Sequence, residues 1–451
     1  MNEQFGEKVK TIFDSITVLQ AKDSDLKRDN ANINGDSPMG AMLQYGANTA
    51  KEYNLEYLVR PEIAKLHRDG WIHIHDLDFY AWTTTCTQIE LRKLFKNGFN
   101  TGHGHLRAPK SIGSYAALAA IAIQSNQNDQ HGGQSVVDFD YAMAEGVRYT
   151  YQKYLKEGYE ICERLNDLKD KEWILDYAME KTTRDTYQAM EGLIHNLNTM
   201  HSRAGAQVPF SSINYGTDTS WEGRLAIEQL LLATEAGLGN GETPIFPIQI
   251  FRVKEGVNYN PDDPNYDLFE LAMKVSAKRL FPNFAFIDAP FNLQYYKPGH
   301  PETEVAYMGC RTRVMGNVYD PSREIAPGRG NLSFTSINLP RLGIESKGDY
   351  LTFFKLLDKM LDATMQQLLD RYKIQASRIV RNFPFLMGEG VWMDSDGLSP
   401  DDTVGDVLKH GTLSIGFCGL AECLVALNGK HHGEDEFSQE LGLRIVGYIR
   451  D

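Results

Sequence analysis

The run Met308-Gly309-Cys310-Arg311-Thr312-Arg313 places a cysteine directly after a glycine. Asn331 follows twenty-one positions later, within Gly328-Arg329-Gly330-Asn331-Leu332-Ser333-Phe334. Far upstream, Cys86 ends the stretch Thr83-Thr84-Thr85-Cys86. The two cysteines are 224 positions apart, so only the fold can bring them to one site. These two thiols and the asparagine decide how the fold and the function of the chain are interpreted.

The composition is that of a folded, water-soluble protein. The chain has 451 residues, enough for one large α/β domain or two or three ordinary domains. Hydrophobic residues make up 42% and the net charge is −14, a charge that disfavours non-specific binding of nucleic acid. No apolar run reaches the roughly 18–20 residues that a membrane span needs, and the first residues do not form a secretory signal. We therefore expect a cytoplasmic protein with neither a membrane nor a nucleic acid as partner.

The five cysteines do not form a recognisable disulfide or zinc pattern. They are odd in number and widely scattered, which argues against a secreted disulfide framework. No Cys-x-x-Cys pair is present, so a structural zinc site within the chain is not expected. Cys418 and Cys423 lie near each other in an apolar run and are predicted to be small core residues.

Helical and β-type segments alternate along the chain. The spacing of apolar residues predicts helices over 266–280 and 350–372, and long helices within 135–164. Short runs rich in β-branched and aromatic residues predict strands over 208–214, 245–251, 283–287 and 331–339. This alternation favours an α/β architecture, but the pattern alone does not distinguish an open sheet from a barrel.

The motifs resemble those of the anaerobic, class III ribonucleoside-triphosphate reductases, a family of glycyl-radical enzymes. The resemblance extends from about Asp29 to Asp451. It implies a ten-stranded α/β barrel of two five-stranded halves over 29–451, surrounded by helices, with the Cys310 run at the tip of a central finger loop. Residues 1–28 are then an amino-terminal helical extension. Further runs that look like this family are Asp36-Ser37-Pro38-Met39-Gly40, Ser202 to Ser212, and Thr412 to Glu422.

The resemblance also implies catalytic roles. Cys310 resembles the transient thiyl radical that takes the 3′ hydrogen of the ribose, shielded inside the barrel from oxidation. Cys86 resembles the second cysteine, which donates hydrogen from the opposite face of the ribose. Asn331, an amide that both donates and accepts hydrogen bonds without titrating, would orient a ribose hydroxyl and formate. Formate is therefore the expected reductant of ribonucleoside triphosphates.

Other residues are candidates for contacts with nucleotides. His73, His75, Ser211 and Ser212 are candidate substrate-binding residues, although an ordinary pair of hydrogen-bonded histidines explains His73 and His75 equally well. Lys110 lies near the region where the family binds ATP and deoxynucleotide effectors at a dimer interface. A solvated surface lysine is the ordinary interpretation of Lys110. The resemblance implies a homodimer.

Several parts of a complete family member are missing from the sequence. These are the Thr-Pro-Ala-Glu phosphate-binding loop, the four-cysteine zinc site, the Arg-x-Cys-Gly-Tyr radical loop and the amino-terminal ATP-cone. The resemblance therefore implies that the radical glycine lies outside these residues and that this chain alone is inactive. An activase with an iron–sulfur cluster and S-adenosylmethionine would generate the radical, and zinc would be confined to the missing segment. A shortened form and one piece of a split enzyme, completed by a second polypeptide, both stay open.

Two other functions stay open from the residues alone. A His-x-His pair on a strand places both imidazoles on one face, as in metal-dependent amidohydrolase barrels, which would bind zinc or another divalent metal. The further metal ligands could come from His103, His105, His195, His201 or Asp288. The chain could also be a catalytically inert, nucleotide-binding remnant or subunit that gives no deoxynucleotide.

Overall fold

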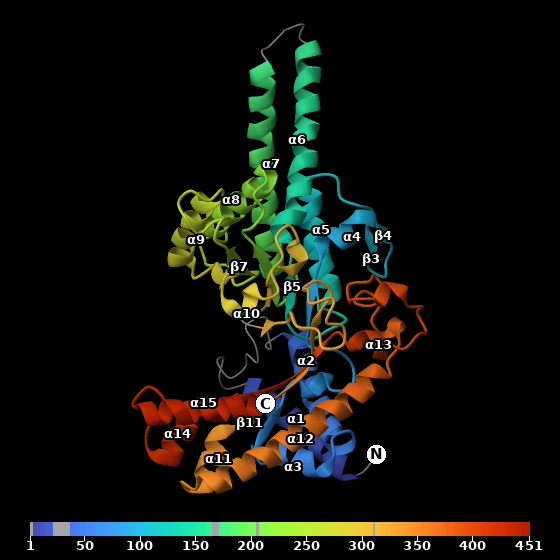
Figure 1. Ribbon diagram of the computed structural model, residues 1–451. Helices are drawn as coiled ribbons and strands as arrows, with labels where there is room; N and C mark the ends of the chain where they lie inside the picture. The colour runs from blue at the N-terminus through green and yellow to red at the C-terminus, as the bar shows by residue number, and fades with distance from the viewer. Residues whose placement is uncertain (1–2, 21–36, 165–170, 204–206, 310–311) are drawn as a thin grey trace.

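The computed structural model describes residues 3–20, 37–164, 171–203, 207–309 and 312–451. Figure 1 shows a curled sheet with helices packed against it and a long helical hairpin projecting from one end. The predicted α/β architecture is confirmed, in the form of a half-barrel. Among the described residues no helix is long and apolar enough to span a membrane.

The described residues contain one eight-stranded sheet and two small hairpins. The parallel part runs through β2 (Cys86–Ile89), β5 (Gln134–Val136), β6 (Ser211–Tyr215), β7 (Ile248–Val253) and β8 (Asn283–Phe286). Next to β2, the antiparallel β11 (Gly330–Asn338) also pairs with β1 (Ile72–Ile74) and with the parallel β12 (Thr412–Cys418). The two hairpins are β3 (Phe99–Asn100) with β4 (His105–Leu106), and β9 (Tyr307–Met308) with β10 (Thr312–Arg313).

Helices connect the strands and cover the outer face of the sheet. Those of the amino-terminal half are α1 (Glu3–Gln20), α2 (Pro38–Tyr57), α3 (Pro61–Arg68), α4 (Leu91–Asn97), α5 (Ile112–Asn126), α6 (Phe139–Arg164) and α7 (Lys171–Thr199). Those of the carboxyl-terminal half are α8 (Trp221–Ala236), α9 (Tyr266–Arg279), α10 (Pro290–Leu293), α11 (Leu339–Ser346), α12 (Tyr350–Ala376), α13 (Gly405–Leu408), α14 (Leu420–Asn428) and α15 (Glu436–Arg450). The predicted helices over 266–280 and 350–372 are confirmed as α9 and α12.

One strand and one cysteine were not predicted correctly. The run that was interpreted as an apolar core segment is the strand β12, which pairs only with β11 among the described residues. Cys418 ends this strand and is exposed, so the prediction of a core residue was wrong for Cys418. Cys423, on α14, is buried as predicted. The error arose because an edge strand leaves part of its length open to solvent even when its sequence is apolar.

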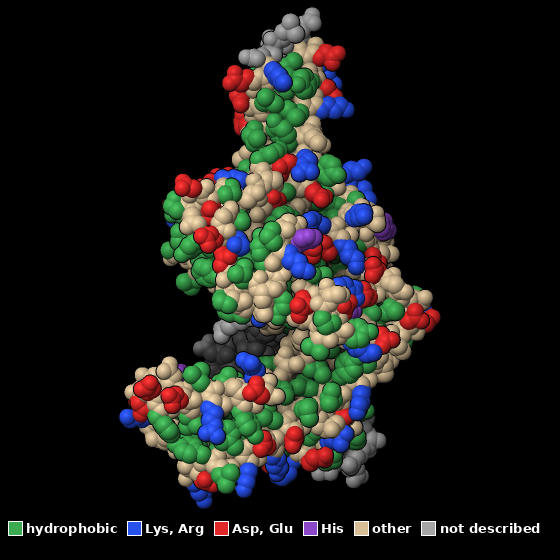
Figure 2. Space-filling model, in the orientation of Figure 1, with side chains coloured by type: hydrophobic (Ala, Val, Ile, Leu, Met, Phe, Trp, Pro, Cys, Tyr) green, Lys and Arg blue, Asp and Glu red, His purple; other side chains and the backbone are tan. Residues whose placement is uncertain are grey.

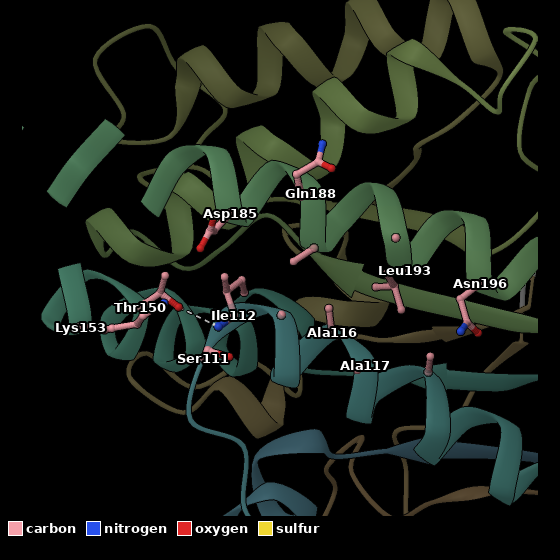
Figure 3. Close-up of a pocket in the computed structure, with 14 residues that line it drawn as sticks. Ser111, Ile112, Ala116, Ala117, Thr150, Lys153, Asp185, Gln188, Leu193 and Asn196 are labelled. Atoms are coloured by element: carbon pink, nitrogen blue, oxygen red, sulfur yellow. Dashed lines mark hydrogen bonds between the residues drawn. The ribbon is translucent and has the colours of Figure 1, made fainter. Parts of the chain in front are cut away.

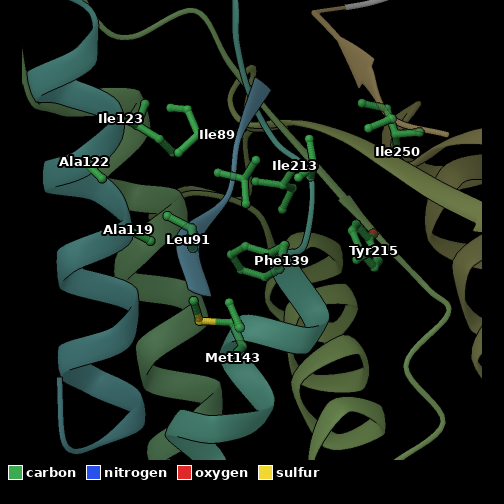
Figure 4. Close-up of a cluster of buried hydrophobic side chains, with 14 of the residues drawn as sticks. Ile89, Leu91, Ala119, Ala122, Ile123, Phe139, Met143, Ile213, Tyr215 and Ile250 are labelled. Carbon is green, nitrogen blue, oxygen red and sulfur yellow. The ribbon is translucent and has the colours of Figure 1, made fainter. Parts of the chain in front are cut away.

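The main hydrophobic core lies between the outer face of the sheet and the helices. Figure 4 shows Ile89 of β2 and Ile213 and Tyr215 of β6 in one hydrophobic cluster with Phe139 and Met143 of α6. All five side chains are almost completely buried, and burial of each such side chain stabilises the fold by about 1.5–3 kcal/mol. Because successive side chains of a strand point to opposite faces of the sheet, the residues that alternate with these apolar ones lie on the inner face.

Arg371 fastens α12 to the chain segment that leads toward Cys86. The side chain is fully buried and donates hydrogen bonds to the carbonyl oxygens of His75 (2.9 Å), Asp76 (3.3 Å) and Tyr80 (3.1 Å). Asp76 has a left-handed backbone (φ 55°), which is uncommon outside glycine. The bonds from Arg371 hold this turn in place.

We expect Arg371→Ala to lower the free energy of unfolding by about 3 kcal/mol, because buried carbonyl groups would lose their donors. Lys373→Ala, on the same helix with a side chain 72% exposed, is the matched control. The control should change stability by less than about 0.5 kcal/mol. Urea unfolding followed by circular dichroism measures both values, and equal midpoints for the two variants would contradict this role of Arg371.

Candidate active site

Cys86 and Asn331 face each other on the inner side of the sheet. The two residues are direct partners in the antiparallel pairing of β2 with β11. The Asn331 side chain is buried, and its Nδ2 donates to the hydroxyl of Ser414 on β12 (3.2 Å). Its Oδ1 is buried without a hydrogen-bond partner among the described residues. The structure therefore brings together two of the three residues singled out from the sequence, and it leaves the amide oxygen available for a ligand.

The third residue, Cys310, lies outside the described residues, but the hairpin that carries it is placed. Met308 of β9 pairs with Thr312 of β10, so the described residues on either side of Cys310 are antiparallel partners. Gly309 has a left-handed backbone (φ 59°), a conformation that favours glycine. A Cβ atom added at Gly133 would lie 3.6 Å from the Gly309 nitrogen. Gly133 precedes Gln134, the partner of Thr87, so the hairpin lies next to the strand position of Cys86.

The environment of Cys86 keeps its thiol protonated. Part of the residue's surface is accessible to solvent, yet the protein around the sulfur raises the pKa of the thiol to about 12 through desolvation. A hydrogen bond from the backbone of Gly133 opposes this effect only partly. Cys86 is therefore suited to donate a hydrogen and poorly suited to act as a thiolate nucleophile.

The two predicted histidines lie together on the inner face, at the end of β1. Their ring centroids are 4.6 Å apart, and His75 Nε2 is 2.9 Å from the Ser336 hydroxyl. Burial, followed by the nearby His73, lowers the pKa of His75 to about 4, so His75 is neutral at physiological pH. His73 opens into a cavity of about 380 Å³, which Asp76 and His131 also line.

His131 joins this cavity to the Cys86 strand. Its backbone nitrogen donates to the Thr84 carbonyl, two residues before Cys86. Burial lowers the pKa of His131 to about 3, and its Nε2 lies 3.5 Å from Asp76 without forming a hydrogen bond. Burial raises the pKa of Asp76. The sequence contained His131 only as one of several histidines, with no motif to distinguish it.

The remaining candidates are placed in different surroundings. The Ser212 hydroxyl is on the inner face and accepts a hydrogen bond from the Gly309 nitrogen (3.1 Å). Ser211, the preceding residue on β6, faces the opposite side of the sheet, and its hydroxyl is buried without a hydrogen-bond partner among the described residues. Lys110 is exposed just before α5.

Next to Lys110 is a second cavity of about 460 Å³, between α5, α6 and α7. Figure 3 shows Asp185 and Gln188 of α7 across from Ser111 and Ile112 at the start of α5. Small side chains on α5 and α7 make room for the cavity, and Lys153 of α6 lies at its side. A hydrogen bond from the Ile112 nitrogen to Thr150 (2.8 Å) fixes the start of α5 against α6.

The residues proposed for a hydrolytic metal centre do not come together. Within the described ranges, no group of three or more His, Cys, Asp or Glu side chains is arranged to hold a metal ion. His73 and His75 contact each other as rings and, through His75, contact Phe334 (4.3 Å between centroids). The amidohydrolase interpretation therefore receives no support from the geometry.

The half-barrel is the fold of solved anaerobic ribonucleotide reductases. The enzyme from Thermotoga maritima with citrate in the active site superposes with a TM-score of 0.63 at 15% identity, covering 99% of this chain and 76% of that one. The structure of that enzyme in complex with dATP and CTP gives a TM-score of 0.65 at 15% identity, covering 99% and 70%. At this identity the likeness establishes the fold alone.

The sequence establishes the family. The model of the family described as anaerobic ribonucleoside-triphosphate reductase matches residues 29–451. The reductase of that name from Escherichia coli K12 is 33% identical over 430 residues, or 93% of this chain and 58% of its own length. The reductase of phage T4 is 31% identical over 418 residues, or 90% and 66%. The chain belongs to the anaerobic ribonucleoside-triphosphate reductase family, and it spans less than two thirds of the length of these relatives.

We expect Cys86 to resist alkylation far into the alkaline range, because burial raises the pKa of its thiol to about 12. At pH 9 only about one Cys86 in 10³ is a thiolate, and this fraction rises tenfold for each pH unit. Iodoacetamide labelling followed by peptide mass spectrometry measures the rate. The exposed Cys418 is the internal control for reagent access. A Cys86 rate that levels off below pH 10 would contradict the prediction.

Proposed function

We propose that this chain is the catalytic portion of an enzyme that reduces ribonucleoside triphosphates to deoxyribonucleoside triphosphates without oxygen. The observation that carries the proposal is the pairing of Cys86 with Asn331 on the inner face, beside the hairpin that leads into Cys310. Family membership supports the reaction class. If the chain forms no deoxynucleotide, the alternative that it is an inert nucleotide-binding subunit is favoured.

Cys310, Cys86 and Asn331 each have a separate role in the proposed reaction. A glycyl radical outside this chain supplies the oxidising equivalent, which converts the Cys310 thiol to a thiyl. The thiyl takes the 3′ hydrogen of the ribose, and the 2′ hydroxyl leaves as water after protonation. Cys86 donates hydrogen from its protonated thiol to the 2′ carbon. Formate restores that thiol and supplies the second electron as it is oxidised to carbon dioxide, and Cys310 returns a hydrogen to the 3′ carbon. Asn331 holds a ribose hydroxyl and formate through its amide, whose oxygen has no hydrogen-bond partner among the described side chains.

The complete enzyme has further parts. The half-barrel, whose edge strands are β8 and β12, belongs in this proposal to a ten-stranded barrel of two five-stranded halves. An activase with an iron–sulfur cluster and S-adenosylmethionine generates the radical, and a zinc site accompanies the radical glycine. His73 and His75 lie on the inner face, where a substrate would contact them. The Ser212 hydroxyl is on the same face but is engaged by the Gly309 nitrogen and the Gln134 carbonyl, which makes it a weaker candidate. Ser211 faces away from the inner face and is the weakest of these candidates.

The cavity beside Lys110 is the proposed effector site. It has room for a nucleotide, Lys153 lines it, and Lys110 directly precedes the lining residue Ser111 in the chain. Gln188 and Asn196 line the other wall. Gln188 Nε2 donates to Glu191 (3.2 Å) and Asn196 Oδ1 accepts from Gln124 (2.7 Å), so a base would meet the remaining amide atoms, Gln188 Oε1 and Asn196 Nδ2. The Thermotoga relative has been solved with dATP bound in the specificity site, which supports a deoxynucleotide as ligand.

The projecting hairpin supports a homodimer. Figure 2 shows hydrophobic side chains along the α6–α7 projection, which stands clear of the rest of the molecule. Tyr159 (52%), Leu175 (39%) and Met179 (39%) are exposed on these helices. A second copy that packs along the helices would bury these side chains and bring two effector cavities close to one interface.

The function is tested by formation of dCTP from CTP under strict anaerobiosis. The chain is combined with the activase, S-adenosylmethionine, formate and a separately supplied radical-bearing segment. We expect product, and we expect Cys310→Ala and Cys86→Ala each to lower turnover by at least about 10³-fold. Cys162→Ala, on α6, is the control. A glycyl-radical signal without any product from the unmodified chain would overturn the catalytic proposal.

The effector site is tested by calorimetric titration with dATP. We expect Lys110→Ala and Lys153→Ala each to weaken dATP binding about tenfold, since each removes a charge near the phosphates. The matched control is Lys156→Ala, one turn along α6 from Lys153, with a side chain that is 81% exposed and paired with Glu160. Identical dissociation constants for all three variants would place the effector elsewhere.

A further inference from the structure

The chain segment that leads into the β9–β10 hairpin is buried, although it is not a strand of the main sheet. Residues 304–309, here called the ascending limb, lie on the inner face, and β9 within the limb pairs only with β10 among the described strands. Ala306 and Met308 have exposed fractions of 0% and 2%. Because buried peptide groups need hydrogen-bond partners, the peptide groups of the limb that β10 does not pair must bond to side chains.

Side chains of three adjacent strands supply these partners. On β6, Asn214 both accepts from the Tyr307 nitrogen (2.9 Å) and donates to the Tyr307 oxygen (3.2 Å). On β5, Ser135 donates to the same oxygen (2.6 Å). Gln88 of β2 donates to the Ala306 oxygen (3.0 Å). With the Ser212 bond to Gly309, four fully buried side chains hold the limb.

The register explains why these four side chains act together. Gln88 is the strand partner of Ser135, and Ser135 is the strand partner of Ser212, so the three form one row across β2, β5 and β6. Cys86 lies two residues before Gln88 and therefore on the same face, one position along. The row that holds the limb is thus adjacent to the position of the candidate catalytic thiol.

A buried ion pair anchors the base of the limb. Glu304 is paired with Arg252 of β7 (2.8 Å) and accepts hydrogen bonds from Thr217 (2.6 Å) and Tyr141 (3.0 Å). Arg252 is also paired with Asp140 (3.2 Å), whose other oxygen accepts from three successive backbone nitrogens after β6. The limb is therefore fixed at its base by charge and along its length by neutral hydrogen bonds.

We propose that Asn214 and Ser212 are positioning residues, which set the location of Tyr307 and Gly309, at the end of the ascending limb, relative to Cys86. This proposal rests on the proposed reductase function. Hydrogen transfer depends steeply on the separation of the reacting atoms, and a displacement of about 1 Å can lower a rate about 10²-fold. Ser212 acts on the residue directly before Cys310, and Asn214 fixes both backbone groups of Tyr307.

The first experiment is hydrogen exchange of the full chain with peptide-level mass spectrometry. Ser212→Ala removes the acceptor of the Gly309 amide, so that amide should exchange about fivefold faster. Asn214→Ala should accelerate exchange at Tyr307 as well. Ser346→Ala is the control, because it removes a buried serine hydroxyl that bonds to the Gly343 oxygen (2.8 Å) in α11, away from the limb. Unchanged exchange rates at Gly309 and Tyr307 would overturn the proposal that Ser212 and Asn214 hold the ascending limb.

The second experiment measures CTP reduction by the same variants in the reconstituted system. We expect kcat to fall about 10²-fold for Asn214→Ala and about tenfold for Ser212→Ala, with KM for CTP within about twofold of the unmodified value. Ser212→Thr keeps the acceptor oxygen and should recover most of kcat. The glycyl-radical signal should be equal in all variants.

The outcomes separate the two proposals. If the unmodified chain is inactive, the reductase function fails and the positioning role fails with it. If the unmodified chain is active but Ser212→Ala and Asn214→Ala turn over like Ser346→Ala, only the positioning role is overturned. If Asn214→Ala fails to fold, Ser212→Ala and Ser212→Thr still decide the question, because each changes only one small side chain.

Discussion

The inner face of this protein depends on one requirement, which is that a buried segment outside the sheet must still have its backbone hydrogen-bonded. The ascending limb meets it through Gln88, Ser135, Ser212 and Asn214. An unpaired peptide group in such a place costs about 1–3 kcal/mol, so an apolar inner face could not accommodate the limb. The polar lining that results is also the surface on which Cys86 and Asn331 face each other.

The outer face of the same strands is apolar and packs against the helices. Ile89, Ile213 and Tyr215 alternate with the polar residues and form the core under α5 and α6. A shift of one residue in the register of β6 would exchange the two faces, burying Ser212 in the core and removing it from the limb. Core packing therefore fixes the geometry of the candidate site.

The sequence predicted the helices well because their apolar spacing is local, as for α9 and α12. It did not predict β12, where Gly416 interrupts the strand pattern. The structure explains this glycine, since a Cβ atom there would lie 2.7 Å from the Phe334 ring. The roles of Cys86 and Asn331 came only from the family resemblance, and no local pattern could indicate that they are strand partners. Asn214 and Ser135 resembled ordinary strand residues, because what distinguishes them is a contact with a segment about 90 or more positions away.

Desolvation keeps the thiol of Cys86 and two histidines of this region uncharged, which suits the hydrogen transfer that we propose. Burial keeps the Cys86 thiol protonated, and it keeps His75 and His131 neutral, with pKa values of about 4 and about 3. Asn331 carries no charge at any pH. A thiolate or an imidazolium at this place would be a charged group in desolvated surroundings, which costs free energy unless the charge is paired. The same desolvation that makes the inner face a poor site for nucleophilic catalysis therefore makes it a suitable one for a thiol that gives up hydrogen.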